Sequence, residues 1–107
     1  MPNETEIEAE IIAKSLTAPR LTPDDIDAAI ANAQYHVFPD SCLTVCCLTL
    51  TNGFTVTGES ACVDPANFNE ELGRKIAWDN ARNKIWPLEG YLLKQRLYEQ
   101  SFPVAPK

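Results

Sequence analysis

Two arginines and two tryptophans recur every four residues in the C-terminal half of the chain: Arg74, Trp78, Arg82 and Trp86. Residues four apart lie on one face of an α-helix, so a helix here would place guanidinium groups and indole rings in one row. Guanidinium groups pair with phosphates, and aromatic rings stack on flat ring systems. The row therefore indicates a surface that can bind a flat, anionic ligand.

The same row also has a purely structural interpretation. Large aromatic side chains are mostly buried in folded proteins, so both tryptophans can be packing residues that the arginines merely border. Asn80 falls on the side of the helix expected to be buried, beside a ridge of small residues, Gly73, Ala77 and Ala81, that would let another helix approach closely. A buried amide needs partners, so Asn80 would bond to a neighbouring backbone or to a ligand at a subunit junction.

No catalytic or metal-binding constellation accompanies these residues. The four cysteines form no Cys-x-x-Cys pair, and their spacing matches no common zinc pattern. A nucleophilic cysteine would depend on His36, the only histidine. We therefore expect no catalytic residues, no metal and no cofactor, and the residue types favour a small binding or assembly protein over an enzyme.

The length of 107 residues predicts one domain, 1–107, with an acidic N-terminal helix at its periphery (1–20), a core (21–100) and a loose tail (101–107). A domain of this size buries a modest share of its surface, which makes a homo-oligomer a reasonable expectation. No apolar run is long enough to span a membrane, and the N-terminus has no signal-peptide pattern, so we expect a cytoplasmic protein.

The net charge of −6 is concentrated at the start of the chain. Residues 1–40 hold eight of the fifteen acidic residues, against Lys14 and Arg20. Binding to a DNA or RNA polymer needs an extended basic surface, which this distribution does not supply. A small phosphate-bearing ligand needs only a few local cations.

The predicted fold class is α+β, and its first elements are helices. Residues 4–16 can form an amphipathic helix with Ile7, Ile11 and Ile12 on one side. Thr22, Pro23 and an acid three residues after the cap then begin a second helix, predicted to run from Pro23 to about Ala33.

Strand signals follow. Residues 35–38 read as a brief strand, and 42–51 and 54–60 as two strands of a hairpin or three-stranded meander. Asn52-Gly53 favours a two-residue type I′ turn, which would set Leu50 opposite Thr55 and Leu48 opposite Thr57. Asp64-Pro65 can cap and start a helical turn at Ala66. The long helix comes next, capped by Asn67 or Asn69, and we expect it to kink or break at Trp86, because Pro87 follows.

The stretch CLTLTNGFTVTGESACVDPANFNEELGRKIAWDNARNKIWPLEGYLL, residues 47–93, resembles a family of small tailed-phage proteins, the gene 49 and gene 66 family of coliphage and Shigella phage. The earlier LTPDDIDAAI, residues 21–30, fits the same pattern. This family is in turn similar to anti-Thoeris sponge proteins, which sequester cyclic ADP-ribose isomers made by a bacterial defence enzyme. The resemblance implies a hairpin-and-helix protein of the host cytoplasm that forms dimers or larger oligomers, with ligand pockets between subunits. Some members also hold cyclic oligonucleotides at a second site.

The resulting hypothesis is a phage protein that removes a cyclic nucleotide signal without cleaving it. Arg74 or Arg82 would pair with phosphates, Trp86 or Phe68 would stack on adenine, and Asn80 would bond to a base edge or ribose. The alternative is a phage accessory protein that binds a host protein through the hairpin edge or the acidic helix. A hydrolase acting on the same signal is a third option.

Overall fold

The computed structural model describes residues 3–102 of the chain. The fold is α+β, as the sequence predicts. In chain order its elements are α1 (Glu4–Ala13), α2 (Pro23–Ala28), β1 (Ile30–Val37), β2 (Thr44–Leu50), β3 (Thr55–Ser60), the 3₁₀ turn η1 (Pro65–Asn67), α3 (Glu70–Asn83) and α4 (Ile85–Gln100).

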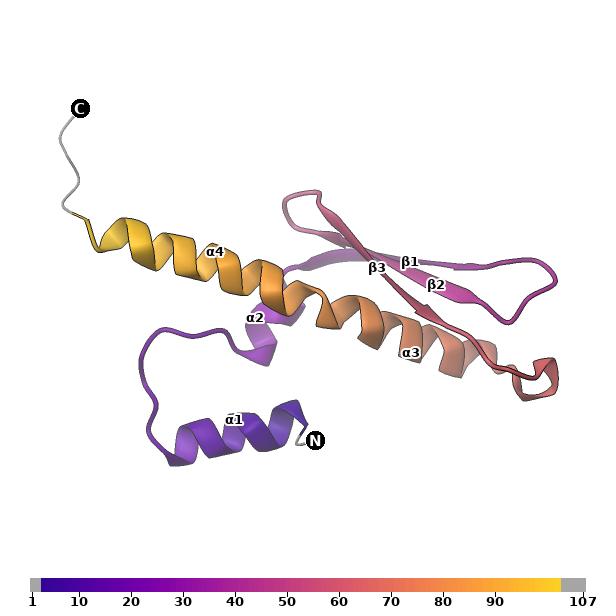
Figure 1. Ribbon diagram of the computed structural model, residues 1–107, viewed down its shortest axis with the longest axis horizontal. Coiled ribbons are helices and arrows are strands. Elements are labelled where there is room, and N and C mark those ends of the chain that lie inside the picture. The colour runs from indigo at the N-terminus through magenta and orange to yellow at the C-terminus, as the bar shows by residue number, and fades with distance from the viewer. Residues whose placement is uncertain (1–2, 103–107) are drawn as a thin grey trace.

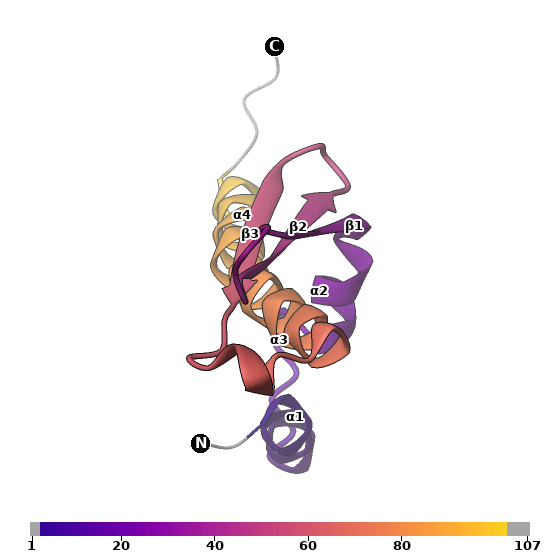
Figure 2. The same ribbon diagram turned by 90° about the vertical axis from the view of Figure 1, so that its right-hand side faces the viewer.

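The elements form three layers. The antiparallel sheet has the order β1-β2-β3, so it is the three-stranded form of the predicted meander. Helix α3 packs across one face of β2 and β3, α2 lies beside α3 on the same side of the sheet and contacts β1, and α1 lies beyond these helices (Figure 1). Figure 2 shows the same layering end-on, with α1 farthest from the strands. The outer face of the sheet carries no helix of the described chain.

The first strand is longer than the sequence predicts. The prediction that α2 continues to about Ala33 is wrong: α2 ends at Ala28, and residues 30–37 form β1, whereas only 35–38 were expected to be extended. Apolar residues at positions 26, 29, 30 and 33 recur at helical spacing. Residues 33, 35 and 37, however, also alternate as in a strand, and pairing with β2 places their side chains on the face of the sheet that α3 covers. Pairing with the central strand decides between the two patterns.

The hairpin between β2 and β3 exists as predicted, but its register differs by one residue. Leu48 lies opposite Val56 and Thr49 opposite Thr55. The loop has three residues rather than two: the Gly53 N–H donates to the Leu50 carbonyl, and Gly53 alone takes the left-handed conformation there, with φ of 89°. A type I′ turn needs positive φ at both central residues, so the predicted turn type is wrong.

The changed register decides which side of β3 is buried. A shift of one residue moves every side chain of a strand to the opposite face of the sheet. Val56, expected on the same side as Cys47, is instead buried with Leu48 and Leu50 beneath α3. The core thus contains the inward side chains of β2, Val56, the residue Ala29 that follows α2, and residues of α2, α3 and α4: Ile26, Ala77, Ala81 and Ile85.

The helix starts follow local sequence signals. Thr22 and Asp25 form a reciprocal capping box on α2, Asp64 caps η1, and the Asn69 side chain accepts the Leu72 N–H at the start of α3. Helix α1 ends earlier than the predicted residue 16, because Ser15 adopts a left-handed conformation with φ of 55°. The N–H groups of residues 15 and 16 then bond back to the last turn, which is the Schellman arrangement.

The long C-terminal helix is bent, as predicted, but the break comes earlier than Trp86. Lys84 separates α3 from α4, and Pro87 lies in the first turn of α4. The first N–H groups of a helix have no partner within the helix, so a proline at this position removes no hydrogen bond. The predicted tail, residues 101–107, lies mostly outside the described residues.

The ridge of small residues on α3 is used inside the protomer. Ala77 and Ala81 are fully buried, and a Cβ at Gly58 of β3 would lie 2.2 Å from the Ala81 nitrogen and 2.4 Å from the Ala77 oxygen. Gly73 faces Thr44 of β2 in the same way, with 3.0 Å between its hypothetical Cβ and Oγ1. The expected close approach therefore occurs, but its partner is the sheet and not another helix.

Candidate functional site

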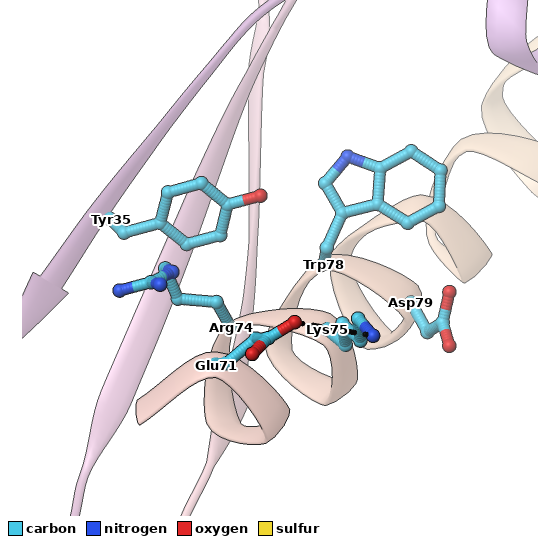
Figure 3. Close-up of a pocket in the computed structure, with 6 residues that line it drawn as sticks. All are labelled: Tyr35, Glu71, Arg74, Lys75, Trp78 and Asp79. Carbon is cyan, nitrogen blue, oxygen red and sulfur yellow. Dashed lines mark ion pairs between the residues drawn. The ribbon is translucent and has the colours of Figure 1, made fainter. Parts of the chain in front are cut away.

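An open hollow lies where the first strand passes α3. It has a volume of about 520 Å³, and its six lining residues are Tyr35, Glu71, Arg74, Lys75, Trp78 and Asp79. Figure 3 shows the Tyr35 ring above the Arg74 side chain, with the Trp78 indole rising from α3 on the same side. Two aromatic rings, two cations and two carboxylates therefore border one hollow.

Arg74 also borders a second hollow. This hollow, of about 610 Å³, lies along β1 and is lined by Ala33, Gln34, Tyr35, His36, Val37, Glu70 and Arg74. The Arg74 guanidinium donates to the Glu70 carboxylate at 2.9 Å within α3, an exposed pair that contributes little to stability. An anionic ligand can therefore compete for this guanidinium at small cost to the fold.

Tyr35 keeps its proton in this setting. Burial raises the pKa of Tyr35 above its ordinary value, the Cys46 side chain raises it further, and the Arg74 charge lowers it. The net direction is upward, so at neutral pH the phenol is uncharged and can donate a hydrogen bond. It adds no negative charge beside Arg74.

Arg82 occupies a different environment, although it is on the same helical row. Its guanidinium bonds to Asp27 at 2.8 Å, to the Pro23 carbonyl at 3.2 Å and to the Glu4 carboxylate. Arg82 is 8% exposed. Its pKa is raised above the ordinary value, chiefly by the bond to Glu4. Arg82 thus joins α1 and α2 to α3.

The two tryptophans of the row flank this cluster. The Arg82 guanidinium carbon lies 5.9 Å from the centre of the Trp78 ring, within the range of a cation–π contact. The Trp86 indole N–H donates to Glu4 at 3.2 Å. The Glu4 carboxylate of α1 therefore accepts hydrogen bonds from both Arg82 and Trp86.

Asn80 is exposed, so the prediction of a buried amide is wrong. Its Nδ2 donates to the Glu59 carbonyl of β3 at 2.8 Å, which is the backbone alternative considered for it. Because β3 is an edge strand, no further strand is present to donate to this carbonyl, and the Asn80 side chain donates to it instead.

Phe68 lies apart from the arginine row. It follows η1 and borders a small hollow of about 90 Å³ near the start of α3. Within one protomer the five predicted ligand-binding residues therefore occupy separate places: Phe68 at the start of α3, Arg74 at the two hollows, Asn80 on β3, and Arg82 with Trp86 at Glu4.

Sequence reasoning missed Tyr35 and Lys75 as site residues. The sequence predicts Tyr35 within a brief strand, residues 35–38, which is too short to show which face of the sheet its side chain lies on. Once residues 30–37 form one strand, Tyr35 lies opposite Cys46 and on the α3 side of the sheet. Lys75 forms an exposed pair with Glu71, at 3.6 Å. Alternation along the full strand was the signal that could have found Tyr35.

Among residues 3–102, no group of three or more histidine, cysteine, aspartate or glutamate side chains is arranged to hold a metal ion. Within the same residues, no helix has the length and apolar character needed to cross a membrane.

Comparison with known proteins places the chain in a family. The sequence model of the phage protein (N4 Gp49/phage Sf6 gene 66) family matches residues 21–97. No curated protein and no solved structure gives a significant match. The matched segment begins just before α2 and ends within α4, so it includes the sheet, α3 and the hollow at Arg74, and it excludes α1.

Proposed function

Since the chain belongs to the phage protein (N4 Gp49/phage Sf6 gene 66) family, we propose that it acts during infection as an anti-defence protein in the host cytoplasm. It binds a cyclic ADP-ribose-type immune signal and holds it without cleaving it. The observation that carries this proposal is the position of Arg74 and Lys75 beside Tyr35 and Trp78 at an open hollow. Those are the groups that a pyrophosphate and an adenine ring need.

In this proposal each group has a distinct task. Arg74 leaves its exposed pairing with Glu70 to bind phosphate oxygens, and Lys75 adds a second cation. Trp78 or Tyr35 stacks on the base, and the neutral Tyr35 phenol donates to a ribose or phosphate oxygen. Sequestration needs slow dissociation and no turnover, so no catalytic group is required.

A second copy of the chain completes the site. The hollow at Arg74 is open, whereas ligand sites usually bury most of their ligand. The radius of gyration is 18.0 Å, and about 13 Å is expected for a compact domain of this length. Within α4, all of which is described, only Ile85 is buried. These features support an oligomer in which a neighbouring copy covers α4 and closes the hollow.

A second candidate function, binding of a host protein, is favoured by α1. None of the residues of this helix is buried, and Ile7 and Ile12 are exposed beside its glutamates. The family match also begins after α1, so this helix can serve a task of its own. In that case substitutions in α1 abolish function, and Arg74→Ala does not.

The test is to incubate the purified chain with a panel of cyclic ADP-ribose isomers and cyclic oligonucleotides. Free ligand is then removed, the protein is denatured by heat, and the released material is analysed by mass spectrometry. An intact nucleotide in the released fraction supports sequestration. A cleaved product indicates a hydrolase. Retention of nothing from the panel contradicts the nucleotide proposal and leads to a host-protein pull-down with wild-type and α1-substituted chains.

A further inference from the structure

Cys42 precedes β2 and Cys62 follows β3, so both lie at the open end of the β2–β3 hairpin. The last paired residues of that ladder are Thr44 and Ser60. If the same register continues for two residues beyond this pair, Cys42 lies opposite Cys62. Both cysteines border the small hollow of about 90 Å³ that also contains Phe68. The register and the shared hollow agree that these two side chains are neighbours.

The chemistry of the two thiols is consistent with this placement. The pKa of Cys42 is raised chiefly by its contact with the Cys62 side chain, with burial a smaller cause. Opposite residues of antiparallel strands have Cα atoms about 4.5–5.5 Å apart. A disulfide needs Cα atoms about 4.4–6.8 Å apart, so neighbouring backbones at this spacing can be bridged with little movement.

The other two cysteines have no such neighbour. Cys46 is fully buried beneath α3 and lies opposite Gly58. Cys47 faces the outer side of the sheet, between Gln34 and Thr57. Both are free, as are Cys42 and Cys62. Among the described residues, Cys42 and Cys62 are therefore the one pair placed for a bond.

We propose that Cys42 and Cys62 form a redox-active dithiol, which a small-molecule disulfide of the glutathione type converts to an intramolecular disulfide. One cysteine thiolate attacks a sulfur of the oxidant, breaks its S–S bond and releases one thiolate. The second cysteine thiolate then attacks the mixed disulfide, forms the Cys42–Cys62 bond and releases the other thiolate. The two protein protons pass to the released thiolates, so the chain is oxidised and the reagent is reduced.

The bond would join two segments that lie outside the helices and strands. Cys42 belongs to the β1–β2 turn, which Ser41 stabilises by donating to the Phe38 carbonyl. Cys62 lies in the connection from β3 to η1, beside the fully exposed Val63. Linking them anchors the residues that lead to Phe68 and α3. Oxidation therefore stabilises this end of the molecule.

The experiment uses the full chain in mixtures of reduced and oxidised glutathione. No lysine or arginine lies between Arg20 and Arg74, so trypsin leaves all four cysteines in one peptide. Cleavage after Glu59 and after Leu43 separates Cys62 and Cys42 from the others. The expected product has lost two hydrogen atoms and shows these two cysteine peptides linked. The thiolate is the attacking species and its fraction grows with pH, so the bond should form faster at pH 8 than at pH 7.

Three variants make the result specific. Cys42→Ser and Cys62→Ser should each give a glutathione adduct in place of the internal bond, whereas Cys47→Ser should behave as wild type. Oxidation should raise the unfolding temperature of the wild type and of Cys47→Ser alone, because the closed loop restricts the unfolded chain. Four free thiols in the oxidising mixtures, glutathione adducts without an internal bond, or a bond that maps to Cys46 or Cys47 would overturn the proposal.

Discussion

Arg74 and Arg82 are eight residues apart on one helix and have opposite surroundings. The Arg74 guanidinium is bordered by two open hollows and pairs only with an exposed glutamate of its own helix. Arg82 is buried among two acids and a carbonyl from α1 and α2. An arginine already bonded on several sides stabilises the fold, and one at a hollow can bind a ligand. The hydrogen-bond partners in the folded chain thus distinguish two arginines that have equivalent positions in the sequence pattern.

The contrast predicts different stabilities for two alanine variants. Arg82→Ala leaves Asp27 and Glu4 without their partner, and a loss of charge-assisted hydrogen bonds costs about 1–3 kcal/mol of unfolding free energy. Arg74→Ala removes one exposed pair, a change within about 0.5 kcal/mol. Thermal unfolding of both variants beside the wild type checks this. Equal unfolding temperatures for the two variants would contradict the assignment of Arg82 to the fold.

Tyr35 gives a prediction that depends on pH. Its pKa is raised in the folded chain, so the folded state holds the phenolic proton more tightly than the unfolded state does. The corresponding stability is present below the unfolded value of about 10 and is lost as pH rises through the higher folded value. The phenolate absorbance of the folded wild type should therefore include a component that rises at higher pH than in the unfolded chain. The Tyr35→Phe substitution should remove this component. Identical titration curves for the folded wild type and the unfolded chain would refute the raised pKa of Tyr35.

At this scale, local signals were predictable and distant partners were not. The caps at Thr22, Asp64 and Asn69 follow from neighbouring residues and are confirmed. One partner of Arg82 is Glu4, which is 78 positions away and brought near only by the placement of α1. Nothing within the helical row indicates that contact. The chemistry of the five predicted residues therefore did not indicate which of them lie together in one protomer.

The contact between α3 and β3 sets the positions of the site elements. Helix α3 approaches the strand so closely that Gly58 has no room for a side chain, and this contact fixes the helix so that Arg74 and Trp78, on a different face, border the hollow beside Tyr35 of β1. The existence of the hairpin and the helix followed from turn chemistry and periodicity. The register did not, because a type I′ turn and a three-residue loop ending in Gly53 both fit Asn-Gly. Burial beneath α3 selects the register that places Val56 inside.

Gly58→Ala tests this contact. The added methyl group would meet backbone atoms of α3 that cannot rotate away, so we expect a loss of about 1–3 kcal/mol or more in unfolding free energy. Gly90→Ala is the matched control: its new Cβ would have only Leu21 nearby, at 3.9 Å, and alanine in a helix is favoured by about 0.5–1 kcal/mol. Denaturant unfolding measures both. A Gly58→Ala chain as stable as wild type would show that α3 does not pack so closely.

The whole molecule is elongated, with principal extents of 61 × 39 × 18 Å. Helix α4 projects away from the sheet (Figure 1), and Tyr91 and Tyr98 on it are more than half exposed. Apolar surface of this kind is commonly covered by another protein. The small-residue ridge, which the sequence indicated as an assembly surface, is already filled by the sheet, so α4 and the outer sheet face are the surfaces left for association.

Self-association follows as a prediction. Light scattering on the purified chain should give a mass that is a multiple of 11.9 kDa and that falls on dilution or on Tyr91→Glu substitution. Glutamate would introduce a charge into the proposed interface, which is costly to bury. Lys94→Glu, also on α4 but at a polar position, is the control. A monomer at all concentrations would contradict the proposed closure of the hollow by a second copy.

Calorimetry of a cyclic ADP-ribose isomer with the wild type, Arg74→Ala and Lys14→Ala chains measures whether Arg74 holds the ligand. Lys14 forms the same kind of exposed pair, with Glu10 at 2.8 Å in α1, but borders neither hollow at Arg74. Loss of a charge-assisted phosphate contact predicts affinity about 10–100-fold weaker for Arg74→Ala. Lys14→Ala should match the wild type. Equal affinities for all three chains would show that Arg74 does not hold the ligand, and no binding by any of them would contradict the proposed sequestration.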